Sequence, residues 1–104
     1  MRKVLLDEQI PNFSAARSLT SVDEAGFKGK QNGELLRLAS ERFDCFLTAD
    51  RRLAFQQNLS AVRIGIVLLR IGSTKLPDLV EYAPQITEAL HVVEPGELLT
   101  VQRR

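Results

Sequence analysis

The chain has 104 residues, of which 44% are hydrophobic, and its 14 Lys and Arg residues nearly balance 13 Asp and Glu residues. This length suits one compact domain spanning residues 1–104 and leaves no room for a second. The net charge of +1 provides no overall basic field, so any polyanion must be bound by a local group of side chains.

Cysteine content and hydropathy indicate the cellular compartment in which the protein is expected. The single cysteine, Cys45, has no partner in the chain, which excludes an internal disulfide and a thiolate zinc cluster. The apolar run that follows Arg2 and Lys3 ends before Asp7, too early for a signal peptide. No segment reaches the roughly 18 apolar residues of a membrane span. We therefore expect a soluble, cytoplasmic protein that makes no membrane contact.

The first half of the chain alternates short apolar runs with helical patterns. A continuous apolar run of three or four residues is typical of a strand buried on both faces. Proline favours the first turn of a helix, and asparagine is a good helix cap. The elements expected are a strand at 3–6, a helix from Pro11 to about Ser18, a strand at 19–23, a glycine-punctuated basic loop at 26–30 and a helix from Asn32 to about Phe43.

The second half continues this alternation. It is expected to contain a strand at 45–48, a polar connection that includes a helical turn after Asp50, a strand at 64–69, a helical pattern from Leu76 that Pro84 kinks or splits, and a last strand at 98–101. Strands that alternate with helices indicate βαβ units. The predicted fold class is α/β, a three-layer α/β/α domain with a mainly parallel central sheet.

Two of the apolar runs end in acidic residues. Asp7 directly follows the first run, and Asp50 follows the run that ends at Thr48. In a parallel sheet the ligand crevice lies beyond the carboxyl ends of the strands, so these two side chains are expected to converge. Carboxylates that converge without a neighbouring base suit Mg²⁺ or Mn²⁺, which bind oxygen ligands and leave room for phosphate oxygens.

Each acid also has a purely structural interpretation. Asp7 can cap the helix expected near Pro11, and Asp50 can cap a helical turn beginning at Arg51. Glu34 lies in the first turn of the second helix, where the helix dipole favours an acid. Glu34 is also a candidate ligand for the same ion.

Basic and amide side chains provide a candidate substrate surface. Arg51 and Arg52 can neutralise phosphates, and Thr48 can donate a hydrogen bond. Lys28 and Lys30 flank a glycine in the basic loop, and Asn32 follows them. The alternative for each of these residues is an ordinary exposed loop.

Several short motifs together resemble a bacterial and archaeal family of small PIN-like proteins. They are Val4-Leu5-Leu6-Asp7-Glu8-Gln9-Ile10-Pro11, Glu24-Ala25-Gly26-Phe27, Asn32-Gly33-Glu34-Leu35-Leu36 with Leu38-Ala39, Phe46-Leu47-Thr48-Ala49-Asp50-Arg51, Ile66-Val67-Leu68-Leu69-Arg70 and Pro95-Gly96. The resemblance covers nearly the whole chain, and it depends on the order and spacing of the motifs.

The resemblance implies a PIN-like fold and membership of a superfamily that includes Mg²⁺- or Mn²⁺-dependent ribonucleases, many of them toxins of toxin–antitoxin pairs. Asp7 and Asp50 match the acids that end the first and third strands in that pattern. The chain departs from the pattern at two positions. Asn32 stands where many relatives carry an acid, and Arg52 stands where many carry a second acid beyond the third strand.

The leading hypothesis is a PIN-like metal-dependent endoribonuclease in which Asp7, Asp50 and Glu34 hold Mg²⁺ or Mn²⁺. The residues expected to bind the RNA backbone are Arg51, Arg52, Lys28, Lys30 and Asn32. The departures at Asn32 and Arg52 support an alternative, a catalytically degenerate module that binds RNA or a protein. An antitoxin partner and a homodimer both remain open.

Overall fold

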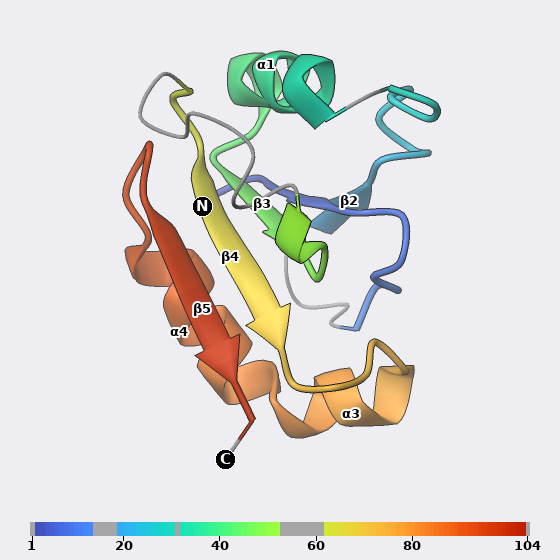
Figure 1. Ribbon diagram of the computed structural model, residues 1–104, viewed down its shortest axis with the longest axis vertical. Coiled ribbons are helices and arrows are strands. Elements are labelled where there is room, and N and C mark those ends of the chain that lie inside the picture. The colour runs from blue at the N-terminus through green and yellow to red at the C-terminus, as the bar shows by residue number, and fades with distance from the viewer. Residues whose placement is uncertain (1, 14–18, 31, 53–61, 104) are drawn as a thin grey trace.

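A computed structural model describes residues 2–13, 19–30, 32–52 and 62–103 of the chain. Within these ranges a five-stranded sheet is the central element, and every strand pair is parallel (Figure 1). The strands are β1 (Val4–Leu6), β2 (Leu19–Ser21), β3 (Cys45–Thr48), β4 (Gly65–Arg70) and β5 (Leu98–Gln102). The predicted α/β class with a parallel sheet is confirmed.

The order of the strands in the sheet is β2-β1-β3-β4-β5. The chain therefore places β2 on one side of β1 and then returns to place β3 on the other side. Leu5 lies between Thr20 of β2 and Phe46 of β3. A reversal of this kind creates a switch point between β1 and β3, and open α/β sheets bind ligands just beyond the carboxyl ends of the strands at such a point.

Both faces of the sheet are buried, which explains why its strands are continuous apolar runs. One buried cluster combines sheet residues with residues of α1 (Asn32–Arg42): Leu5, Phe46, Ile66, Leu35, Leu36 and Ala39. The other combines sheet residues with residues of α3 (Leu76–Glu81) and α4 (Ala83–Val92): Val4, Leu6, Leu47, Val67, Leu79, Ile86 and Leu90. Since neighbouring residues of a strand point to opposite faces, α1 covers one face while α3 and α4 cover the other.

Side-chain hydrogen bonds and prolines explain where β2 ends and where α3 and α4 are separated. After β2 the chain turns at a reciprocal pair, in which the N–H of Ser21 donates to Glu24 Oε1 at 3.0 Å and the N–H of Glu24 donates to Ser21 Oγ at 3.0 Å. Two separate helices, α3 and α4, meet at Tyr82, and a proline occupies the first turn of each. Pro84 thus splits the helical pattern as expected, because proline has no N–H to continue the first helix.

The helix expected from Pro11 is wrong in its first residues. Residues 11–13 are described and are not helical, and residues 14–18 lie outside the described ranges. The N–H of Ile10 donates to the carbonyl of Asp7 and closes a turn before Pro11. Ile10 and Phe13 are both buried in the core, so hydrophobic packing, and not helical hydrogen bonding, positions this segment.

The amino ends of the strands are held by main-chain contacts of charged residues. The guanidinium of Arg2 donates to the carbonyls of Leu90, at 3.2 Å, and Val93, at the end of α4. The N–H of Lys3 donates to Asp44 Oδ2 at 2.8 Å, directly before β3.

Gly65, the first residue of β4, also contributes to this packing. A Cβ built on it would lie 2.7 Å from Val93 Cγ1 and 3.1 Å from the carbonyl oxygen of Glu94. The absence of a side chain at Gly65 therefore allows the segment before β5 to approach β4 closely.

None of the helices in the described ranges combines the length and apolar character that crossing a bilayer requires.

Candidate functional site

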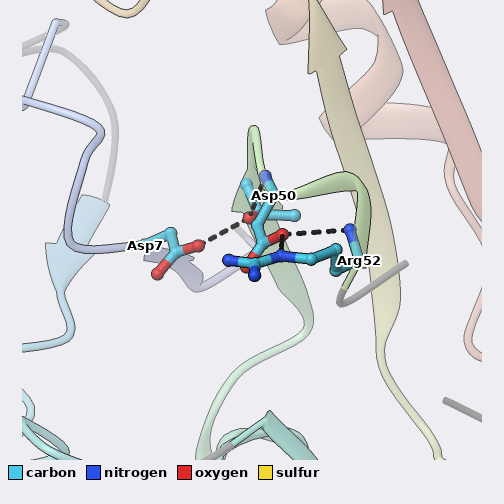
Figure 2. A network of polar contacts seen from close by, with 4 residues as sticks. Asp7, Asp50 and Arg52 are labelled. Atoms are coloured by element: carbon cyan, nitrogen blue, oxygen red, sulfur yellow. Dashed lines mark hydrogen bonds and ion pairs between the residues drawn. The ribbon is translucent and has the colours of Figure 1, made fainter. Parts of the chain in front are cut away.

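Asp7 and Asp50 lie at the switch point between β1 and β3. The N–H of Asp7 donates to the carbonyl of Leu47 at 3.0 Å, which extends the pairing of β1 and β3 by one residue and fixes the start of the Asp7 side chain. Asp50 lies two residues beyond the end of β3. Figure 2 shows the Asp7 carboxylate pointing toward Asp50. The sequence-based expectation that parallel strand ends bring these two acids together agrees with this arrangement.

Thr48 joins the two acids. Its side chain is fully buried, with an exposed fraction of 0%. Its hydroxyl donates to Asp7 Oδ2 at 2.6 Å and accepts a hydrogen bond from the N–H of Asp50 at 3.0 Å. The other oxygen of Asp7, Oδ1, accepts from the N–H of Glu8 at 2.8 Å. These contacts orient Asp7 and the backbone of Asp50 before any ligand binds.

Asp50 also pairs with Arg52, one of the residues at which the chain departs from the PIN-like pattern. Asp50 Oδ1 accepts from the Arg52 N–H at 3.0 Å and lies 3.6 Å from Arg52 Nε (Figure 2). The Arg52 side chain is 81% exposed and that of Asp50 is 28% exposed. An ion pair this exposed contributes at most about 1 kcal/mol, because water screens it and holding the long side chain costs entropy.

A small cavity of about 160 Å³ is bordered by Asp7 and Asp50, and we call it the acidic crevice. It is lined by Asp7, Glu8, Gln9, Val22, Lys30, Leu35 and Asp50. Three carboxylates and one ammonium group therefore border it. The acidic crevice has an excess of negative charge, which favours a cation as its ligand.

Glu34 is not among the residues that line the acidic crevice. It is exposed, on the first turn of α1, and its Oε1 lies 3.5 Å from Nζ of Lys30. The spacing of four residues is the usual one for such a pair. The structure thus brings Lys30 to the border of the crevice and Glu34 to Lys30, while Glu8, which was not a predicted ligand, borders the crevice itself.

The predicted RNA-binding residues are distributed unevenly. Arg51 and Arg52 border a second cavity of about 270 Å³ together with Gln9 and Asp50, next to the acidic crevice. Lys30 borders the crevice, as described above. Lys28 is exposed and lines none of the cavities described in this structure. The backbone of Asn32 begins α1, and its side chain lies outside the described part of the chain.

Sequence inspection missed two features of this region. Thr48 was a candidate donor to substrate, but the structure shows that its proton is donated to Asp7. Arg70, Ser73 and Thr74 line a larger cavity beyond the end of β4. The position of Arg70 at the end of an apolar run was the available signal, because the strand-end rule applies to basic residues as well as to acids.

Asp7 and Asp50 both border the acidic crevice, and two carboxylates are within the number that a hydrated divalent ion takes from a protein. Mg²⁺ typically takes one or two protein carboxylates and completes its shell with water and substrate phosphate. Asp7 and Asp50 supply that number, and each uses only part of its acceptor capacity in the hydrogen bonds described. No group of three or more acidic, histidine or cysteine side chains among the described residues is arranged to hold a metal by itself.

Comparison of the chain with protein-family models, with curated proteins and with solved structures found no match of any of the three kinds. The PIN-like resemblance therefore stays a prediction from the motifs.

Proposed function

We propose that the protein is a PIN-like endoribonuclease that uses Mg²⁺ or Mn²⁺ at the acidic crevice. The observation that carries the proposal is the placement of Asp7 and Asp50 at the switch point of a parallel sheet, joined through Thr48. This is the position at which α/β sheets bind ligands. The motif resemblance supplies the reaction class and RNA as the substrate.

Asp7 and Asp50 would hold the ion, and Thr48 would keep Asp7 oriented toward it. The bound ion would supply an activated water molecule and stabilise the charge that grows on the phosphate. Arg51 and Arg52 are exposed next to Asp50, where their guanidinium groups can bind the flanking phosphates of the RNA. Glu8 borders the same crevice and can accept hydrogen bonds from water within it.

The cations near the site are compatible with this function. Arg52 is largely exposed and its pair with Asp50 is weak, so the guanidinium can move from Asp50 to an RNA phosphate at small cost. Lys30 is similarly paired with Glu34 across two side chains that are 43% and 49% exposed. Neither pair removes the acceptor oxygens of Asp7.

The test uses the purified chain, a labelled single-stranded RNA, and Mn²⁺ or Mg²⁺. Asp7→Asn and Asp50→Asn should each reduce the cleavage rate by at least about 100-fold, because each removes a charged group from the reacting centre. Added Mn²⁺ should also raise the unfolding temperature of the wild type, since an ion that binds the folded state stabilises it. Both variants should lose most of that increase.

Glu41→Gln provides the matched control. Glu41 is an exposed acid on α1, paired with Arg37 and not part of the crevice, so this variant should cleave RNA and respond to Mn²⁺ as the wild type does. The proposal is wrong if the wild type cleaves no RNA with either ion. It is also wrong if Asp7→Asn and Asp50→Asn cleave at the rate of Glu41→Gln.

A second candidate is favoured by the two ion pairs. The pairs Arg52–Asp50 and Lys30–Glu34 reduce the negative charge available for metal, as expected of a catalytically degenerate module that binds RNA or a protein. For this candidate the chain should bind RNA, while added Mn²⁺ should neither raise the unfolding temperature of the protein nor lead to cleavage of the RNA. A toxin role with an antitoxin partner stays a prediction of the resemblance.

A further inference from the structure

A larger cavity, of about 480 Å³, lies beyond the carboxyl ends of β3 and β4. Its polar border is formed by Arg51, Arg70, Ser73 and Thr74, and we call it the basic pocket. Its volume falls within the range of roughly 300 to 1,000 Å³ that is typical of small-ligand sites. No acidic residue is among the described residues that line it. Among the described residues, the charged side chains that line this pocket are therefore both cationic.

The strand β5 brings a third arginine to the same place. The N–H of Arg103 donates to the carbonyl of Arg70 at 3.2 Å, which continues the pairing of β4 and β5. Its guanidinium Nη1 reaches 3.6 Å from the position that a Cβ on Gly72 would occupy. Gly72 has a φ of +85°, a conformation that side chains disfavour. The positive φ accounts for the glycine at this position, and Arg103 lies within contact distance of it.

Hydroxyl groups supplement the arginines. Ser73 and Thr74 both line the basic pocket and are half-buried. Ser73 Oγ accepts a hydrogen bond from the N–H of Lys75 at 3.0 Å, so its own proton remains available to a ligand. Guanidinium and hydroxyl groups together are the usual donors to phosphate oxygens in nucleic-acid complexes.

A third cavity lies between the basic pocket and the acidic crevice and borders both. The cavity of about 270 Å³ between them shares Asp50 and Gln9 with the crevice and shares Ala49 and Arg51 with the pocket. The three cavities therefore follow the carboxyl ends of β1, β3 and β4 in order. Charge changes along this path, from the carboxylates of Asp7, Glu8 and Asp50 to the guanidinium groups of Arg51 and Arg70.

We propose that the basic pocket binds an internal phosphodiester of the same single-stranded RNA that reaches the acidic crevice with another of its phosphates. The proposal rests on the proposed function, from which it takes RNA as the polymer. An RNA strand laid along the three cavities would have one phosphate next to the carboxylates, where a cation is required to offset the repulsion between negative charges. Another phosphate would lie among the arginines, where no additional cation is required. The pocket thereby determines the register of the strand at the acidic crevice.

The test measures binding and not cleavage. Fluorescence anisotropy with a labelled short oligouridylate, in EDTA, gives the dissociation constant at several salt concentrations. Arg70→Gln and Arg51→Gln should each weaken binding by about three- to tenfold and should each reduce the slope of log K against log salt by about 0.7, the value for one lost phosphate contact on a single strand. Both side chains are exposed, so thermal unfolding should match the wild type.

Arg37→Gln is the control, since it removes the same charge from the exposed face of α1, where Arg37 pairs with Glu41. Its binding and its salt slope should equal those of the wild type. The proposal is overturned if Arg70→Gln binds as tightly as Arg37→Gln. It is also overturned if Arg70→Gln weakens binding only for an oligouridylate with a 5′-terminal phosphate, because the site would then recognise a terminal phosphate.

The result of this binding experiment can be distinguished from the result of the cleavage experiment. If Arg70→Gln loses RNA affinity while the wild type cleaves no RNA with Mn²⁺, the basic pocket is supported and the endoribonuclease proposal fails. If the wild type cleaves RNA and Arg70→Gln leaves both binding and the KM for cleavage unchanged, the pocket proposal fails and the nuclease proposal stands.

Discussion

Charged side chains occur at both ends of the parallel sheet, but they contact different partners at each end. At the amino ends of the strands, Arg2 donates to the carbonyls of Leu90 and Val93, and Asp44 accepts from the N–H of Lys3. At the carboxyl ends, Asp7 is bound by the hydroxyl of Thr48, and Asp50 pairs with an arginine that is 81% exposed.

The difference in contacts distinguishes charged residues that stabilise the fold from charged residues that can bind a ligand. Arg2 cannot leave without unpairing the part-buried carbonyls at the end of α4, whereas the main-chain N–H groups that donate to Asp7 and Asp50 belong to exposed residues and can bond to water instead. An acid paired with a mobile surface cation can exchange that cation for another at little cost. Substitutions at the amino ends should therefore change stability, and substitutions at the carboxyl ends should change binding.

The largest change in stability is expected for Gly65→Ala at the amino end of β4. The new Cβ would meet Val93 Cγ1 at 2.7 Å and the carbonyl of Glu94 at 3.1 Å, so the segment before β5 must shift. We expect the free energy of unfolding to fall by about 1–3 kcal/mol, the usual cost of overpacking. Urea denaturation measures it. RNA affinity of the folded variant should be unchanged, and an unchanged unfolding midpoint would contradict the prediction.

Arg2→Gln should have the next largest effect. The variant loses charged hydrogen bonds to the carbonyls at the end of α4 and the favourable interaction of a cation with that end of the helix. We expect a loss of about 1–2 kcal/mol in the free energy of unfolding. Arg63→Gln, which removes an exposed arginine just before β4, is the control. Equal stability of the two variants would show that the contacts of Arg2 contribute nothing.

The smallest change in stability is expected for Arg52→Gln at the carboxyl end. Because the Arg52 side chain is 81% exposed, the free energy of unfolding should change by no more than about 0.5 kcal/mol. Removing a cation from Asp50 should strengthen Mn²⁺ binding by a small factor, about two- to fivefold. Calorimetric titration measures this, with Arg37→Gln as the control. Weaker Mn²⁺ binding by Arg52→Gln than by the wild type would contradict this prediction.

Much of the fold could be predicted because both faces of the sheet are covered. Strands buried on both faces are unbroken apolar runs, and the runs at β1, β3 and β4 gave their positions to within about a residue. Pro84 gave the break between α3 and α4. The convergence of Asp7 and Asp50 could be predicted from the rule that parallel strands end at one edge of the sheet.

Other features depend on contacts that periodicity does not encode. Residues 10–13 are positioned by the burial of Ile10 and Phe13, which overrides the helical preference of proline at that place. The approach of Arg103 to Gly72 depends on β4 and β5 being neighbours in the sheet. By contrast, the pairing of Lys30 with Glu34 could have been predicted from their spacing of four residues.

The hydrogen bonds of Thr48 have a chemical consequence for selectivity. Its single hydroxyl proton is directed to Asp7, and its lone pairs face the amide of Asp50 and the surrounding interior. Thr48 itself is fully buried, so the acidic crevice presents the carboxylate oxygens of Asp7 and Asp50 and receives no donor from Thr48. A bare phosphate would meet electron-rich atoms there and be repelled, whereas a hydrated metal, an ammonium or a guanidinium would find complementary lone pairs.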